Sequence, residues 1–118
     1  MLIIIKGILM KLNVGIKLWL ETENGYVFGE GILEILNKIQ ELGTLRGATK
    51  ELGMSYRHAW GIIKKSEQRI GKPLLATHKG GKLGGGGAEL TAEAKLLIDK
   101  YLEVKNALQK IDKDYEIV

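Results

Sequence analysis

Basic side chains crowd the middle of this 118-residue chain, where they could neutralise the phosphates of a polyanion. Residues 44–82 carry nine of them against two acidic residues, a net charge of +7, whereas the whole chain nets only +4. They are Arg46, Lys50, Arg57, Lys64, Lys65, Arg69, Lys72, Lys79 and Lys82, and the acidic residues are Glu51 and Glu67. This uneven distribution favours one surface for a polyanion. The alternative is a solvated basic face without a partner.

Residue types suited to catalysis or metal binding are scarce. The chain has no cysteine, which excludes a disulfide framework, a thiolate zinc site and a cysteine nucleophile, and which fits a reducing cytoplasm. The two histidines, His58 and His78, have no partner at ligand spacing, and no Ser/His/Asp set stands out. The phosphate-binding string G-x-x-x-x-G-K-[ST] is absent too. We therefore expect a cytoplasmic protein that is not an enzyme and has no metal or cofactor.

Two short helices are predicted inside the basic segment. Thr44 can cap a helix over residues 45–52, and Ser55 can cap a second one that ends at Gly71, before the proline. The three residues 53–55 that join them, Gly-Met-Ser, are typical of a DNA-binding helix-turn-helix. The alternative is an ordinary pair of helices within a core.

The second helix of a helix-turn-helix presents its N-terminal residues to the DNA major groove. Arg57 can bind a guanine edge with two hydrogen bonds, and nearby polar side chains can add base or phosphate contacts. Farther along, Arg69 and two lysines are expected to meet phosphates, whereas Trp60 is expected in the core. The predicted DNA-binding residues on this helix are Ser55, Tyr56, Arg57, His58, Lys64 and Lys65.

A glycine-rich hairpin follows the two helices. Residues 74–78 read as a strand, residues 80–87 contain six glycines and one lysine, and residues 88–90 would return antiparallel. After a helix-turn-helix such a hairpin is a wing, and its glycines allow the backbone to approach DNA closely. The residues predicted to meet phosphates or the minor groove are His78, Lys79 and Lys82.

Two strings of the chain carry a resemblance to a known family. Gly-Met-Ser-Tyr-Arg-His-Ala-Trp (53–60) and Lys-Gly-Gly-Lys-Leu-Gly-Gly-Gly-Gly-Ala-Glu-Leu-Thr (79–91) resemble the N-terminal domain of ModE-type molybdate-responsive regulators. That domain is a winged helix-turn-helix related to the LysR type, and the resemblance covers roughly residues 30–115. It implies DNA binding and dimerisation.

The same resemblance bears on molybdate. The full regulators carry a second, β-rich molybdate-binding module after the last helix, and this chain ends at Val118, without room for one. We therefore expect that these residues do not sense molybdate or tungstate.

The last helix is predicted to start after Thr91 and to run to about Tyr115. Apolar residues recur along it at spacings of four and three, which is a heptad pattern suited to a partner helix. Leu96, Ile98 and Leu102 form a second apolar stripe, so that one stripe can pack on the chain's own core and the other on a partner chain. The predicted dimer interface comprises Leu97, Tyr101, Val104, Leu108 and Ile111. The alternative is a helix that packs wholly on its own domain.

The N-terminal part is apolar but interrupted by Lys6, Lys11 and Lys17, which argues against a membrane span. Alternation of apolar residues over 11–20 predicts a strand, with a second strand near 26–28. Met10 could be the natural start, with residues 1–9 an upstream extension. The spacing of apolar residues over 31–42 then predicts an amphipathic helix.

Together these elements predict one α+β domain over residues 1–118, a winged helix-turn-helix with a glycine-rich wing and a long C-terminal dimerisation helix. The favoured function is a homodimeric, sequence-specific transcriptional regulator that binds double-stranded DNA. The alternative is a winged-helix module whose basic face binds an acidic protein partner. Competition by unrelated DNA separates the two, because only a regulator retains one tight site.

Overall fold

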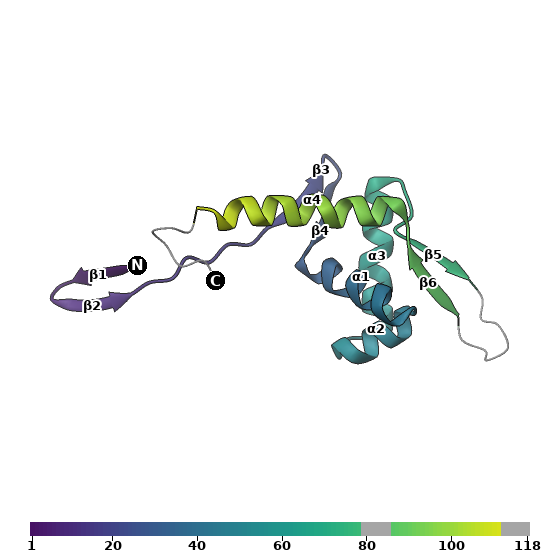
Figure 1. Ribbon diagram of the computed structural model, residues 1–118, viewed down its shortest axis with the longest axis horizontal. Helices are drawn as coiled ribbons and strands as arrows, with labels where there is room; N and C mark the ends of the chain where they lie inside the picture. The colour runs from purple at the N-terminus through teal and green to yellow at the C-terminus, as the bar shows by residue number, and fades with distance from the viewer. Residues whose placement is uncertain (79–85, 112–118) are drawn as a thin grey trace.

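The computed structural model describes residues 1–78 and 86–111, and it has the predicted α+β winged helix-turn-helix architecture (Figure 1). In chain order the elements are β1 (Leu2–Ile5), β2 (Ile8–Lys11), β3 (Trp19–Thr22), β4 (Gly25–Gly29), α1 (Glu30–Leu42), α2 (Leu45–Leu52), α3 (Tyr56–Ile70), β5 (Leu75–His78), β6 (Gly87–Leu90) and α4 (Ala92–Gln109). The strands pair as three antiparallel hairpins, β1 with β2, β3 with β4, and β5 with β6. Of the helices described, none is both long and apolar enough to cross a membrane.

The helix-turn-helix has the predicted boundaries because short-range caps define them. The side chain of Thr44 accepts a hydrogen bond from the backbone N–H of Gly47 (2.9 Å), and that of Ser55 accepts one from the N–H of His58 (3.1 Å). Gly53 ends α2 with a left-handed φ of 67°, a conformation that glycine adopts without strain. The turn between the helices thereby sets the start of α3.

The core lies beneath α1, which packs against α2, α3, β4 and β6. One face of α1 is fully buried. The core that it enters also contains two small residues, Ala48 of α2 and Ala59 of α3. The other large members of the core come from β4, α3, the start of β5 and α4. The fully buried apolar residues include Phe28, Ile32, Ile35, Leu36, Ile39, Ile63, Leu74, Ala94 and Tyr101.

Thr91 fastens the base of the wing hairpin to α4. Its backbone N–H donates to the carbonyl of Leu74 (3.0 Å), and its hydroxyl donates to the carbonyl of Pro73 (2.8 Å). The same hydroxyl oxygen accepts from the N–H of Ala94 and so caps α4, as predicted. The hairpin is also held to the end of α1, because the N–H of Ala88 donates to the carbonyl of Gly43.

The predicted strand over residues 11–20 is wrong. The chain instead forms a hairpin of β1 and β2, which Figure 1 shows far from the helices, and β3 begins only at Trp19. Lys6 and Gly7 both have positive φ (51° and 80°), the geometry of the two-residue turns that close hairpins. Between the hairpins, Leu12 and Ile16 are exposed, so their alternation does not bury one face of a strand. The predicted strand near 26–28 is confirmed as β4.

The last helix is shorter than predicted, and one of its predicted interface residues lies in the core. α4 ends at Gln109, and Tyr115 falls outside the described residues. The side chain of Tyr101 is buried (2% exposed) and its ring packs on Phe28, with ring centroids 5.4 Å apart. Tyr101 therefore packs inside its own chain and is removed from the proposed dimer interface.

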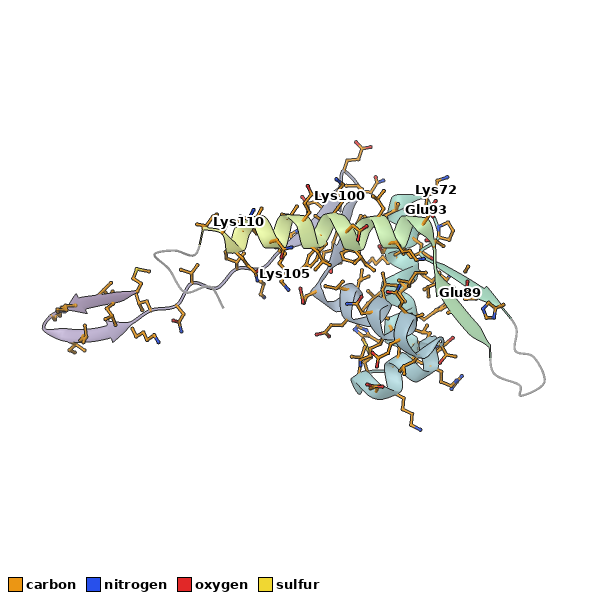
Figure 2. The ribbon with its side chains drawn as sticks, viewed as in Figure 1. Lys72, Glu89, Glu93, Lys100, Lys105 and Lys110 are labelled. Atoms are coloured by element: carbon orange, nitrogen blue, oxygen red, sulfur yellow. The ribbon has the colours of Figure 1, made fainter. Side chains whose placement is uncertain are left out.

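Tyr101 also joins α4 to the start of α1 through Glu30. Its hydroxyl donates to the Glu30 carboxylate (2.6 Å), and Lys105, labelled on α4 in Figure 2, donates to the same carboxylate (3.2 Å). The hydrogen bond from Tyr101, followed by the interactions with Lys105, lowers the pKa of Glu30. Burial, followed by the interactions with Glu30, raises the pKa of Tyr101 to about 12.

Replacing Tyr101 with Phe should reduce the free energy of unfolding at pH 7 by about 1 kcal/mol, because the carboxylate loses a hydrogen-bond donor. A depressed pKa stabilises the fold above the carboxyl group's unfolded pKa, and this stabilisation disappears as the pH falls through the folded pKa. The gap between wild type and Y101F should therefore shrink below about pH 4. Urea denaturation at pH 7 and pH 3 measures it.

Tyr56→Phe is the matched control, since Tyr56 is exposed on α3 and its hydroxyl forms no hydrogen bond within the described residues. It should leave the stability at both pH values unchanged. A gap between wild type and Y101F that stays constant from pH 7 to pH 3 would show that Glu30 is not coupled to Tyr101.

Candidate nucleic-acid interface

The outward face of α3 carries three basic side chains that have no acidic partner among the residues described. Arg57, His58 and Lys65 are exposed, and within residues 1–78 and 86–111 none of the three has an ion pair or a side-chain hydrogen bond. Ser55 caps this end of the helix, and its hydroxyl hydrogen can still donate to an anion. The N-terminus of α3 and its basic face are therefore both available to a phosphate-rich ligand.

Four side chains of the two helices form a column of stacked rings and cations. The Tyr56 and Trp60 rings are nearly parallel (8°), with centroids 6.4 Å apart. The Arg46 guanidinium carbon lies 5.2 Å from the Tyr56 centroid, and the Lys64 ammonium lies 4.4 Å from the Trp60 centroid. Cations so placed are held by the ring faces. The column thus holds two positive charges beside α3, that of Arg46 from α2 and that of Lys64 from α3 itself.

A groove separates this column from the wing. It has a volume of about 170 Å³ and is lined by both helices of the helix-turn-helix and by both wing strands. The groove is lined by Tyr56, Trp60 and His78. The structure thus places His78, the predicted DNA-binding residue of the wing, on the same groove as Tyr56, a predicted DNA-binding residue of α3. Trp60, which is predicted in the core, packs against the core but is only partly buried, and it also lines the groove.

Lys64 differs from the other predicted cations because it has an acidic partner. Its ammonium lies 3.0 Å from one carboxylate oxygen of Glu67, whose other oxygen accepts from the N–H of Leu74 (2.6 Å). Glu67 therefore anchors the start of the wing to α3, and Lys64 balances its charge. Half of the Lys64 side chain remains exposed (52%), so it can still reach a phosphate.

Arg69, which is expected to meet phosphates, also has a structural role within the chain. Its guanidinium donates to the backbone carbonyl of Tyr26 (2.7 Å) and lies against Gly25. Asn24 donates from its side chain to the carbonyl of Arg69 in turn (3.4 Å). These contacts join the end of α3 to the β3–β4 hairpin, a long-range arrangement that the spacing of residues along α3 could not indicate.

Two of the predicted DNA-binding residues, Lys79 and Lys82, lie outside the described residues. Two basic residues without an assigned role, Arg46 and Lys72, turn out to flank α3, the first in the column and the second in an open hollow beside Lys65. Among the residues described, no group of three or more His, Asp or Glu side chains could hold a metal ion.

A helix-turn-helix followed by a hairpin wing, with an unpaired basic face on its second helix, defines a winged helix-turn-helix DNA-binding protein. Residues 32–95 match the profile of the bacterial regulatory helix-turn-helix proteins of the lysR family. The chain therefore belongs to this family of bacterial regulatory helix-turn-helix proteins.

Its curated relatives are regulators and proteins connected with molybdenum. The chain is 29% identical over 92 residues to the molybdenum-pterin-binding protein MopB of Rhodobacter capsulatus, a match that covers 78% of this chain and 34% of MopB. It is 32% identical over 89 residues to the transcriptional regulator ModE of Haemophilus influenzae, covering 75% and 34%. With the dual regulator ModE of Escherichia coli K12 the identity is 36% over 69 residues, covering 58% and 26%. The chain thus spans about a third of the length of the first two relatives.

Proposed function

We propose that the chain is a ModE-like, homodimeric regulator that recognises a specific DNA sequence and acts in the cytoplasm. The observation that carries the proposal is the unpaired basic face of α3 beside the wing groove. The N-terminal half of α3 enters the major groove, where Arg57 reads a base edge and Lys65 meets a phosphate. Arg46 and Lys64, held by the aromatic column, meet the phosphates on either side.

The dimer in this proposal is formed by an apolar strip on the outer side of α4. Leu97 and Val104 are spaced by seven residues on α4, and Ile111 follows at the same spacing just beyond the end of the helix. Val104 and Ile111 are large apolar side chains that remain exposed (39% and 61%), together with Leu96. Leu108, by contrast, lines an apolar pocket with Leu18 of its own chain. Leu97, however, packs partly against the chain's own core. The strip therefore supports an interface on Val104 and Ile111, with a lesser part for Leu97 and Leu108.

The test is selection of duplexes from a random library, followed by fluorescence anisotropy with the selected duplex and an unrelated one. We expect the selected duplex to bind at least about a thousandfold more tightly and to contain two related half-sites. Affinity for both duplexes should fall steeply with salt, because each neutralised phosphate releases counterions. Equal affinity for all duplexes would contradict sequence-specific recognition.

The relatives named for molybdenum are matched over only about a third of their length. The comparisons therefore do not indicate whether this chain binds molybdate. Our proposal remains that these 118 residues bind neither molybdate nor tungstate by themselves. Isothermal titration calorimetry with each oxyanion tests it. Saturable binding at micromolar concentration that survives removal of the basic side chains of α3 would overturn it.

A further inference from the structure

Gly61 of α3, like Gly31 of α1, is a helical glycine that the fold of the chain does not require. It lies inside α3, on the exposed face, four residues from both Arg57 and Lys65. A Cβ atom placed on it would meet no atom within 4 Å. By contrast, Gly43, Gly53 and Gly71 end helices with left-handed φ values of 81°, 67° and 80°.

A glycine inside a helix weakens that helix, since glycine ranks below all residues except proline as a helix former. Neither close packing nor backbone conformation explains this cost at Gly61. The gap that it leaves lies on the same face as the unpaired cations of α3. At Gly61, unlike at Gly31 of α1, the missing side chain therefore leaves room on the basic face, where a bound polyanion would lie.

The surroundings of Gly61 indicate what approaches it. Together with Lys64, Lys65 and Lys72 it lines an open hollow of about 730 Å³ on the outer side of α3. Glu67 also lines the hollow, but its carboxylate is bound by Lys64 and by the backbone of the wing. The hollow is lined by several lysines and, at Gly61, by backbone without a side chain. It therefore fits a polyanion that approaches the helix backbone closely.

We propose that Gly61 is the point at which the α3 backbone comes closest to the base edges of the major groove. The inference rests on the proposed function, and it adds a residue that sets how deeply α3 enters the groove. The lysines around the hollow hold the phosphates on its rim, and the absence of a Cβ at Gly61 allows Arg57 to reach its base. A methyl group at this position would increase the shortest distance between the α3 backbone and the DNA.

The experiment compares Gly61→Ala with Gly31→Ala in the full chain. Gly31 is the matched control, because it is also helical and exposed, a Cβ there also meets no atom, and it lies on α1, away from the basic face. Both variants should melt at the same or a higher temperature than wild type, by up to about 8 °C. Only Gly61→Ala should lose affinity for the selected duplex, by about tenfold or more.

The outcome separates this inference from the proposed function. A folded Gly61→Ala variant whose affinity for the selected duplex stays within about twofold of wild type would overturn the inference while the function stands. A wild-type chain that prefers no duplex would overturn both. A Gly61→Ala variant that is more stable than wild type and yet binds the selected duplex less tightly is the result expected here.

Discussion

Aspartate in place of both Val104 and Ile111 is expected to convert the proposed dimer into a monomer that has lost its preferred DNA site. In a two-fold interface the double variant places four carboxylates on the apolar strip, and each unpaired buried charge costs several kcal/mol. Its affinity for the selected duplex should fall by about two orders of magnitude or more, toward the affinity for unrelated DNA, because one half-site offers too few contacts. Sedimentation and anisotropy measure the two effects.

The fold of each chain should survive this change, because Val104 and Ile111 are exposed in the single chain. Far-UV circular dichroism should therefore match wild type. The control is Leu102→Asp with Asn106→Asp, which places the same number of carboxylates on exposed α4 positions outside the heptad-spaced strip. This control should remain dimeric. A V104D/I111D chain that stays dimeric would move the interface to another surface.

The last helix shows why a repeat in the sequence does not by itself locate an interface. A straight α-helix has 3.6 residues per turn, so a stripe repeating every 3.5 residues drifts slowly around it. Ala94 and Tyr101 face the chain's own core, whereas Val104, farther along α4, and Ile111, beyond its end, are exposed. The heptad pattern predicted that α4 has an apolar stripe. Only the packing of β4 and α1 against α4 shows where that stripe leaves the core.

Elements with local causes were predictable to the residue. α2 and α3 begin and end as predicted because Thr44, Gly53, Ser55 and Gly71 act within one or two turns of the chain. The turn at Lys6 and Gly7 is local too, because two consecutive residues with positive φ close the hairpin.

Contacts between distant parts of the chain were not predictable. Arg69 was assigned to phosphates from its type and position, yet the carbonyl of Tyr26, forty-three residues earlier, takes its guanidinium. Trp60 is predicted in the core because aromatic residues on helices usually pack there, and it does pack against the core, but its ring also contacts Tyr56 and Lys64 and stays only partly buried. In each case the deciding partner depends on how the helix-turn-helix packs, which a single sequence does not show.

Replacing Arg57 with Ala is expected to cost about 1–3 kcal/mol of affinity for the selected duplex and to relax the preference at one base pair in each half-site. Arg57 is exposed near the start of α3 and has no acidic partner among the residues described, so its guanidinium is available to a guanine edge. The loss should be much smaller for an unrelated duplex, where it only removes one charge. Anisotropy against the selected duplex and its single-base variants measures both losses.

Two variants separate base reading from charge. Arg57→Lys keeps the charge but loses the planar pair of donors, so it should restore affinity for unrelated DNA without restoring the base preference. Lys65→Ala, on the same face of α3, should weaken all duplexes about equally and lower the salt slope by about 1. If Arg57→Ala instead behaves like Lys65→Ala, with every base preference intact, Arg57 contacts phosphate, and the base-reading residue must be sought elsewhere on α3.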